Sequence, residues 1–279
     1  MRVGNNPLKN NAVAASILPV AICAVTHLPN LQGYHARRLE IVQVSLLSMR
    51  KFAGMDASIV IWDNGSCEEL TDWIEQEYKP DIFIRSINMG KATARTALFR
   101  MMPPKTIVAC SDDDMLFYPN WLQPQIDLLK GFPNVSCVTG YPVRTSFRWG
   151  NQKTAKWAKK NASVQIGKFI PKLWEYDFAV SIGREPREHE QMTEADQDVM
   201  IEYNGLKAYA TSHHCQFIGY ADKVGQVVQY DGLAMSDERP FDIALDTIGL
   251  RLSTIDRLSR HMGNVIHDEL REEITRLRL

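Results

Sequence analysis

The sequence lacks the features that mark nucleic-acid-binding, repeat and membrane-spanning proteins. Its basic and acidic residues nearly balance, with a formal net charge of −1, whereas a nucleic-acid footprint needs a concentrated basic face. We therefore expect no nucleic-acid partner. No internal repeat or low-complexity segment occurs. The apolar stretch at residues 12–25 is interrupted by a serine and a proline and is too short to span a bilayer.

That stretch also lies close to the N-terminus, where Arg2 and Lys9 resemble the basic start of a signal peptide. We interpret it instead as leading into the first core strand, because polar sequence that carries motifs follows directly.

Cysteine is scarce, and its pattern argues against a disulfide framework. The five cysteines are odd in number and include no Cys-x-x-Cys pair. Cys23, Cys110 and Cys137 lie in apolar runs, which favours buried free thiols. Free thiols are typical of a reducing compartment, so we expect a cytoplasmic protein.

What the sequence does contain is an alternation of strand and helix patterns over its first half. The expected strands are 20–25, 58–62, 82–87, 106–110 and 135–139, and the expected helices are 36–52, 68–77, 91–100 and 121–129. This order predicts an α/β fold with a mainly parallel sheet flanked by helices and right-handed crossovers. A hydrophobic content of 45% supports a substantial core.

The second half is less regular. Residues 141–190 show few periodic runs, so we expect an irregular stretch there. Beyond it the pattern predicts a helix at 195–203, closed by Asn204-Gly205, then a strand at 208–212. Residues 240–279 predict a C-terminal helical extension. Its mixed charges favour a packed or homo-oligomeric helix over a basic membrane anchor, although contact with a membrane surface stays open.

Three consecutive acids, Asp112-Asp113-Asp114, follow the buried strand expected at 106–110. Like charges repel unless something offsets them, and Mg²⁺ or Mn²⁺ prefers carboxylate oxygens. Ligands of open α/β sheets bind at the carboxyl ends of strands. The triplet therefore suggests a metal-assisted phosphate site, and an acidic surface turn is the alternative.

Two further motifs stand at strand ends. Asp63-Asn64-Gly65-Ser66 ends the second strand, where its acid could accept hydrogen bonds from a base or ribose, or simply form an Asx turn. Asn88-Met89-Gly90-Lys91 opens a helix that carries Arg95. A helix N-terminus with a nearby cation suits an anion, but an ordinary loop with an exposed lysine would look the same.

The order and spacing of these motifs resemble the GT-A glycosyltransferases of family 2 over roughly residues 18–219. Members carry an Asp-Gly-Ser-like signature after the second strand and an Asn-x-Gly-Lys-x-x-Ala-Arg-like stretch. A DxD motif then precedes a proline by five residues, as Asp114 precedes Pro119 here. The resemblance implies a glycosyltransferase domain at 1–239, with a nucleotide-binding half at 18–130 and an acceptor and catalytic half at 131–239. Residues 240–279 lie outside it.

The resemblance assigns roles to the matching positions. The donor nucleotide would be held by Thr26, Asp63, Asn64, Lys91, Arg95, Asp112 and Asp113. Asp114 would ligate Mn²⁺ or Mg²⁺, which stabilises the negative charge that grows on the leaving diphosphate. UDP is the commonest donor nucleotide in the family, and GDP remains open.

The family also carries acids near the start of a late helix, often Glu-Asp-x-Asp, followed by a glycine. The matching segment is Glu194-Ala195-Asp196-Gln197-Asp198, with Gly205 after it. Asp196 matches the base that would deprotonate the acceptor hydroxyl, and Asp198 is the second candidate. Alanine at 195 departs from the family pattern and leaves open which acid faces the acceptor. Acids at this place also suit a helix N-terminus without any catalytic role.

A histidine in the region of His213-His214 serves as a second metal ligand in some GT-A enzymes. The resemblance favours His214 and keeps His213 as the alternative, while a structural hydrogen-bonding role is also open. The acceptor, a saccharide or another hydroxyl compound, would lie against aromatic and basic residues of the irregular stretch. These candidates are Trp149, Trp174 and Arg148, with Trp157, Tyr176, Arg144 and Arg184 nearby in sequence. The tryptophans could equally be core residues.

The predicted function is metal-dependent transfer of a sugar, of the hexosyltransferase type, from a nucleotide-diphosphate sugar to a hydroxyl acceptor, by inversion. A nucleotidyltransferase is one alternative, but its usual Gly-rich basic loop after the first strand is replaced here by Thr26-His27-Leu28-Pro29-Asn30. A non-catalytic nucleotide-sugar-binding protein of the same fold is another. It would predict a damaged DxD motif, whereas this motif is intact.

Overall fold

A computed structural model describes residues 17–227 and 238–279. Its main sheet is built from β1 (Val20–Thr26), β2 (Ser58–Asn64), β3 (Ile82–Ser86), β4 (Ile107–Ser111), β6 (Val135–Thr139), β7 (Ser163–Gly167), β8 (Asp198–Tyr203), β9 (Leu206–Tyr209), β10 (Gln216–Tyr220) and β11 (Leu250–Ser253). The strand order is β3-β2-β1-β4-β10-β6-β11-β9-β8-β7. Only β7, β9 and β10 run against the other strands. The predicted α/β class with a mainly parallel sheet is thus confirmed.

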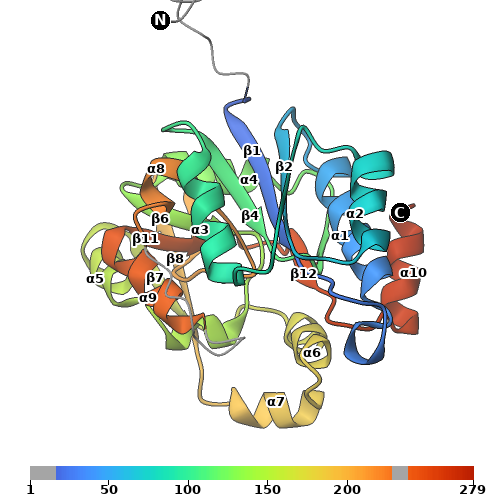
Figure 1. Cartoon of the computed structure of the whole chain (residues 1–279). Coiled ribbons are helices and arrows are strands. Elements are labelled where there is room, and N and C mark those ends of the chain that lie inside the picture. The colour runs from blue at the N-terminus through green and yellow to red at the C-terminus, as the bar shows by residue number, and fades with distance from the viewer. Residues whose placement is uncertain (1–16, 228–237) are drawn as a thin grey trace, which may run out of the picture.

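Helices cover both faces of this sheet (Figure 1). They are α1 (Arg38–Lys51), α2 (Glu68–Trp73), α3 (Lys91–Met101), α4 (Gln123–Gly131), α5 (Gln152–Asn161), α6 (Lys172–Ser181), α7 (Pro186–Met192), α8 (Ala221–Val224), α9 (Arg239–Ile248) and α10 (Asp268–Arg276), with shorter helical turns at Gly33–His35, Ile74–Tyr78 and Arg144–Arg148. Successive side chains of β1 point to opposite faces. Ile22 joins one core with residues of α1 and α4, and Cys23 joins another with residues of α3, α8 and α9.

The first half of the chain follows the predicted order of elements. Parallel pairing sets Thr26 of β1 opposite Asp63 of β2, and β1 pairs with β4 on its other side. The carboxyl ends of these three strands therefore meet at one edge, which brings the predicted strand-end motifs together.

The second half corrects two predictions. The stretch 141–190 is not irregular: it contains the turn at Arg144–Arg148 followed by α5, β7, α6 and α7. The helix expected at 195–203 is wrong as well, because this segment forms β8, which pairs with β7 and β9. Asn204 and Gly205, with φ of 49° and 78°, make the two-residue turn of a hairpin. They link β8 to β9, whereas the sequence pattern predicts that they end a helix.

The C-terminal stretch holds the expected helices α9 and α10, but strands lie between them. β11 is inserted in the main sheet between β6 and β9, and β12 (Ser259–His261) pairs with the short strand β5 (Met115–Phe117). Helix α10 lies beside α1 (Figure 1), where Leu270 and Ile274 pack in one cluster with Ile41 and Val44. An apolar face of α10 is therefore used within the chain, and an oligomer through this helix stays a prediction.

All five cysteines are free, and Cys23, Cys110 and Cys137 are buried, as predicted. Among the described residues, no helix is both long and apolar enough to cross a membrane.

Candidate functional site

The acidic triplet lies where the chain leaves β4 and turns into β5. The backbone N–H of Asp112 donates to the carbonyl oxygen of Cys215 at 2.8 Å, which fixes the turn to the segment before β10. Each of the three carboxylates then meets a different set of cationic or polar groups. The triplet is therefore built into the fold and is not a solvated surface turn.

Asp112 faces α3. The Nζ of Lys91, the first residue of that helix, lies 2.7 Å from its carboxylate. Lys91 also lies 2.9 Å from Glu238, whose other oxygen is 2.5 Å from Arg95. The two predicted phosphate-binding cations thus lie side by side at the triplet, and both contact an acid that the sequence analysis did not identify.

Asp113 is held by Arg38 and by backbone. Arg38 donates to Oδ1 at 2.5 Å, and the N–H of His27 donates to Oδ2 at 3.2 Å. Burial raises the pKa of Asp113, although Arg38 opposes that change. Asp113 therefore serves to anchor α1 against the end of β4.

Asp114 has the environment most suited to a cation. Its Oδ2 accepts from Arg38 at 3.3 Å and lies 3.3 Å from Nε2 of His261 on β12. Burial works against ionisation, but His261 and Arg38 hold the pKa of Asp114 well below its usual range. Its Oδ1 is buried, and no group in the described residues donates a hydrogen bond to it. A buried carboxylate oxygen without a donor fits a hard divalent cation.

His214 points toward the same cluster. Its Nδ1 lies 2.8 Å from Asp242 on α9, and its Nε2 lies 3.5 Å from Glu238. Burial lowers the pKa of His214, but Glu238 and Asp242 outweigh it and raise the pKa overall. A carboxylate on Nδ1 leaves Nε2 as the ligating atom, as in many metal-bound histidines.

His213 has a more enclosed setting. Its ring packs edge-on against Tyr141 and Phe178, and burial lowers its pKa well below the usual value, so it is neutral. Its Nδ1 accepts from the N–H of Cys215 at 3.3 Å. One ligand atom from each of His213, His214 and Cys215 lies within 4.8 Å of the others, but burial raises the pKa of the Cys215 thiol well above its usual value. A protonated thiol is a poor ligand.

The residues predicted to hold the nucleoside lie at the ends of β1 and β2. Thr26 donates to Asp63 at 3.2 Å, and Asp63 accepts from the N–H groups of Gly65 and Ser66. The side chain of Asn64 accepts from the N–H of Met89, at the loop before α3. These contacts make a rigid turn that adjoins the lysine and arginine of α3.

The two candidate bases have different environments. Asp198 is fully buried at the start of β8 and accepts from Arg144, through Nε and Nη2, and from the N–H groups of Phe169 and Ile170. Asp196 lies in the loop before β8, is partly exposed, and is bound by Arg148 at 2.7 Å. No hydrogen bond or ion pair of the described residues joins Asp196 to the aspartate triplet.

Two of the predicted acceptor residues lie against different arginines. Trp149 is 39% exposed and lies against the guanidinium of Arg239, whereas Trp174 on α6 stacks with Arg257. Trp157 packs against Phe132 and belongs to the core.

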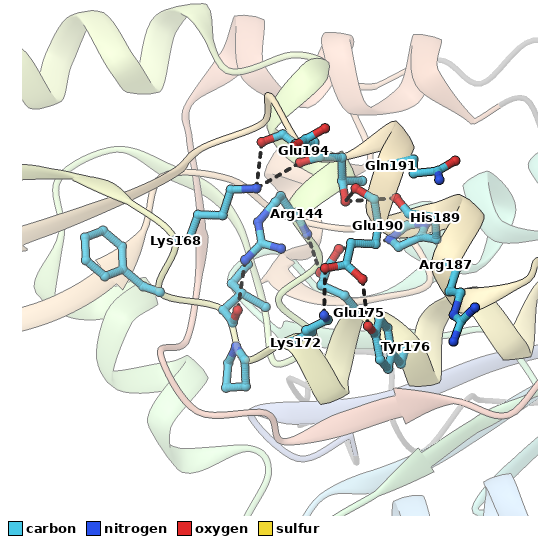
Figure 2. A pocket seen from close by; sticks show the side chains of 14 residues that line it. Arg144, Lys168, Lys172, Glu175, Tyr176, Arg187, His189, Glu190, Gln191 and Glu194 are labelled. Atoms are coloured by element: carbon cyan, nitrogen blue, oxygen red, sulfur yellow. Dashed lines mark hydrogen bonds and ion pairs between the residues drawn. The ribbon is translucent and has the colours of Figure 1, made fainter.

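A cavity of about 790 Å³ lies in the region of α6 and α7. Figure 2 shows its charged lining, in which Lys172 and Tyr176 both contact Glu190, and Lys168 donates to the carbonyls of Thr193 and Glu194. It borders Arg144 and the loop that leads to Asp196. In Figure 1, α6 and α7 lie together below the sheet.

Four residues of the site were missed from the sequence. Arg38 was seen only as part of a helix. Glu238 lies at the end of the predicted acceptor and catalytic half, and Asp242 and His261 belong to the stretch expected to be an extension. Three adjacent acids do signal that cations must be near. Sequence alone, however, does not show which of the 32 lysines and arginines come together with them.

One family model and several solved structures are similar to this chain. The sequence model of glycosyl transferase family 2 matches residues 35–185, more than half of the chain. No curated protein matches. Similar solved structures include GalNAc-T7 with UDP, GalNAc and Mn²⁺ (14% identity, covering 89% of this chain and 44% of that one, TM-score 0.48) and S. aureus TarS 1–349 (11%, 92% and 63%, 0.47). A third is the mannosyltransferase PcManGT from Pyrobaculum calidifontis with GDP-Man and Mn²⁺ (17%, 47% and 39%, 0.33). The chain spans less than two thirds of the length of each.

Proposed function

Because this chain belongs to glycosyl transferase family 2, we propose that it is a metal-dependent glycosyltransferase. It transfers a sugar, as a hexosyltransferase, from a nucleotide-diphosphate donor, with UDP-sugars favoured over GDP-sugars, to the hydroxyl of a saccharide or another acceptor. The observation that carries the proposal is the aspartate triplet at the end of β4. Asp112 pairs with Lys91 of α3, and Asp114 has a buried carboxylate oxygen to which no described residue donates.

Asp114 and His214 are proposed to hold Mn²⁺ or Mg²⁺, with His213 as the alternative to His214. Oxygen and imidazole ligands together suit Mn²⁺, and His261 also lies beside Asp114. A bound divalent ion would stabilise charge on the leaving diphosphate as a Lewis acid.

The rest of the donor is proposed to lie along the strand ends. Thr26, Asp63 and Asn64 would contact the nucleoside, Asp112 and Asp113 would border the ribose and the diphosphate, and Lys91 and Arg95 would offset phosphate charge. The turn after β2 supports this arrangement. The N–H groups of Gly65 and Ser66 hold the carboxylate of Asp63 in one orientation, and a side chain that is already oriented binds a ligand at a lower entropic cost.

Asp196 is proposed as the base that takes the proton of the acceptor hydroxyl in a single, inverting displacement. Arg148 would orient its carboxylate, and an ionised, oriented carboxylate can accept a proton. Asp198 is the weaker candidate, because four donor groups already occupy its oxygens. The acceptor would lie near Arg148, Trp149 and Trp174.

The protein is proposed to act in the cytoplasm, free or peripheral to the membrane, and the free thiols support a reducing compartment. A homo-oligomer remains a proposal.

The first test is thermal stabilisation by UDP, GDP, CMP and dTDP, each with and without Mn²⁺, repeated on Asp114→Asn. A ligand that binds only the native state raises the melting temperature by mass action. We expect one nucleotide to stabilise the wild type only with Mn²⁺ and to lose that effect in Asp114→Asn. Absence of any nucleotide effect would overturn the proposed donor site.

A further inference from the structure

The carboxylate of Glu238 lies where the cations of the donor site converge. One oxygen lies 2.5 Å from Arg95, and the other lies 2.9 Å from Lys91 and 3.5 Å from His214. Glu238 immediately precedes α9, and its side chain is 17% exposed. A carboxylate that contacts three basic groups at once occupies the kind of position that a phosphate would take.

We propose that Glu238 is a specificity-determining residue, which makes the donor site accept a nucleoside diphosphate only together with a divalent cation. This inference rests on the proposed function, since it assumes that Lys91 and Arg95 serve the diphosphate. In this proposal Glu238 weakens the binding of a nucleotide that has no divalent cation, and it takes no part in the transfer reaction.

The charge balance of the site supports this role. Glu238 forms ion pairs with Lys91 and Arg95. The positive charge of both cations is therefore already offset, with Asp112 as a second acid on Lys91. A diphosphate that enters without a metal would find Lys91 and Arg95 already paired with carboxylates. These carboxylates would repel it, because like charges at short range are unfavourable. A divalent cation that enters with it removes much of that repulsion.

A purely structural role for Glu238 predicts something different. Arg95 is buried, and a buried guanidinium requires a counter-ion. If this were the only role, loss of the charge would lower stability and would leave the link between metal and nucleotide unchanged. The two roles can therefore be distinguished by measuring how strongly nucleotide binding depends on metal, separately from the stability of the protein.

The experiment is calorimetric titration of UDP and GDP, with and without Mn²⁺, into the wild type and Glu238→Gln. For the nucleotide that binds, we expect Glu238→Gln to raise the metal-free affinity about tenfold, within the usual range of coupling between two ligands. The affinity measured with Mn²⁺ should change much less, so the ratio of the affinities with and without Mn²⁺ should be smaller in Glu238→Gln than in the wild type. The three aspartates remain, so some metal dependence should persist.

Glu273→Gln is the matched control. Glu273 has a similar exposure, 18%, and pairs with Arg260 at 2.7 Å, but it lies on α10. It should lower the melting temperature without changing nucleotide binding. Glu238→Asp, which keeps the charge, should retain the strong metal dependence and serves if Glu238→Gln does not fold.

The outcomes separate the two proposals. Nucleotide binding whose metal dependence is the same in the wild type and Glu238→Gln would overturn the role of Glu238 and leave the donor site standing. If no nucleotide binds either protein under any condition, the proposed function fails, and this inference fails with it.

Discussion

Asp196 and Asp198 are two positions apart in the sequence, yet their surroundings suit them to different roles. The carboxylate of Asp198 accepts from a buried arginine and from two backbone N–H groups, so it connects β8 with the segment after β7 and with the turn at Arg144–Arg148. Asp196 has one cationic partner and partial exposure. Charge and residue type are the same in both, and only burial and partners distinguish them.

Substitution by asparagine should separate these roles. Asp196→Asn should fold normally and bind nucleotide, but lose about 10²–10⁴-fold in turnover because the proton acceptor is gone. Asp198→Asn should instead destabilise the fold by about 3–5 kcal/mol, since it leaves Arg144 buried without its charge partner. Urea unfolding and a donor-hydrolysis or transfer assay would measure both effects. Normal turnover in Asp196→Asn would eliminate it as the base.

The residues of the candidate site differ in how far away in the sequence their partners lie. The triplet, Lys91 and Arg95 could be predicted, because each lies in a short motif beside the element that positions it. Arg38 reaches Asp113 from 75 residues away, and Glu238 reaches Lys91 from 147 residues away. Such contacts depend on how the sheet and helices pack, and no short pattern encodes them.

At the scale of elements, the first half could be predicted and the second half only in part. Buried parallel strands such as β4 read as continuous apolar runs, and α1 shows a helical apolar spacing, so each has a distinct period. In β8 the buried side chains are those of Asp198 and Ile201, which breaks the two-residue alternation of a strand and imitates a helix. The turn Asn204-Gly205 was the better signal, because this pair favours the two-residue hairpin.

That hairpin gives a prediction at the same scale. Gly205 has a φ of 78°, and a Cβ built there would meet nothing within 4 Å. Gly205→Ala should therefore cost about 1–2 kcal/mol through backbone strain alone, without a steric clash. Denaturant unfolding would measure it. Lys207→Ala, in the same hairpin with a loose 3.8 Å contact to Glu202, should change stability by less than about 0.5 kcal/mol. Equal effects would argue against the strained turn.

At the scale of the whole molecule, Arg251 connects β11 with segments up to 102 residues away in the sequence. Its side chain is fully buried in β11 and donates to the carbonyls of Trp149 and Gly150, to Ser212 and to Asp242. Asp242 in turn contacts His214. The stretch that the sequence suggested was an extension therefore supports the site from within the sheet.

Arg251→Met should consequently destabilise the whole fold. The thioether side chain fills similar space but takes the arginine partner from the buried Asp242 and leaves it the contact with His214. Breaking a buried pair in this way costs about 3–5 kcal/mol. Adding Asp242→Asn should recover part of that loss, because the stranded charge disappears. Arg271→Met is the control: its pair with Glu40 is about half exposed, and exposed pairs contribute about 0–1 kcal/mol. Urea unfolding followed at two wavelengths would measure all four proteins. A loss in Arg251→Met no larger than in the control would show that packing alone holds these segments together.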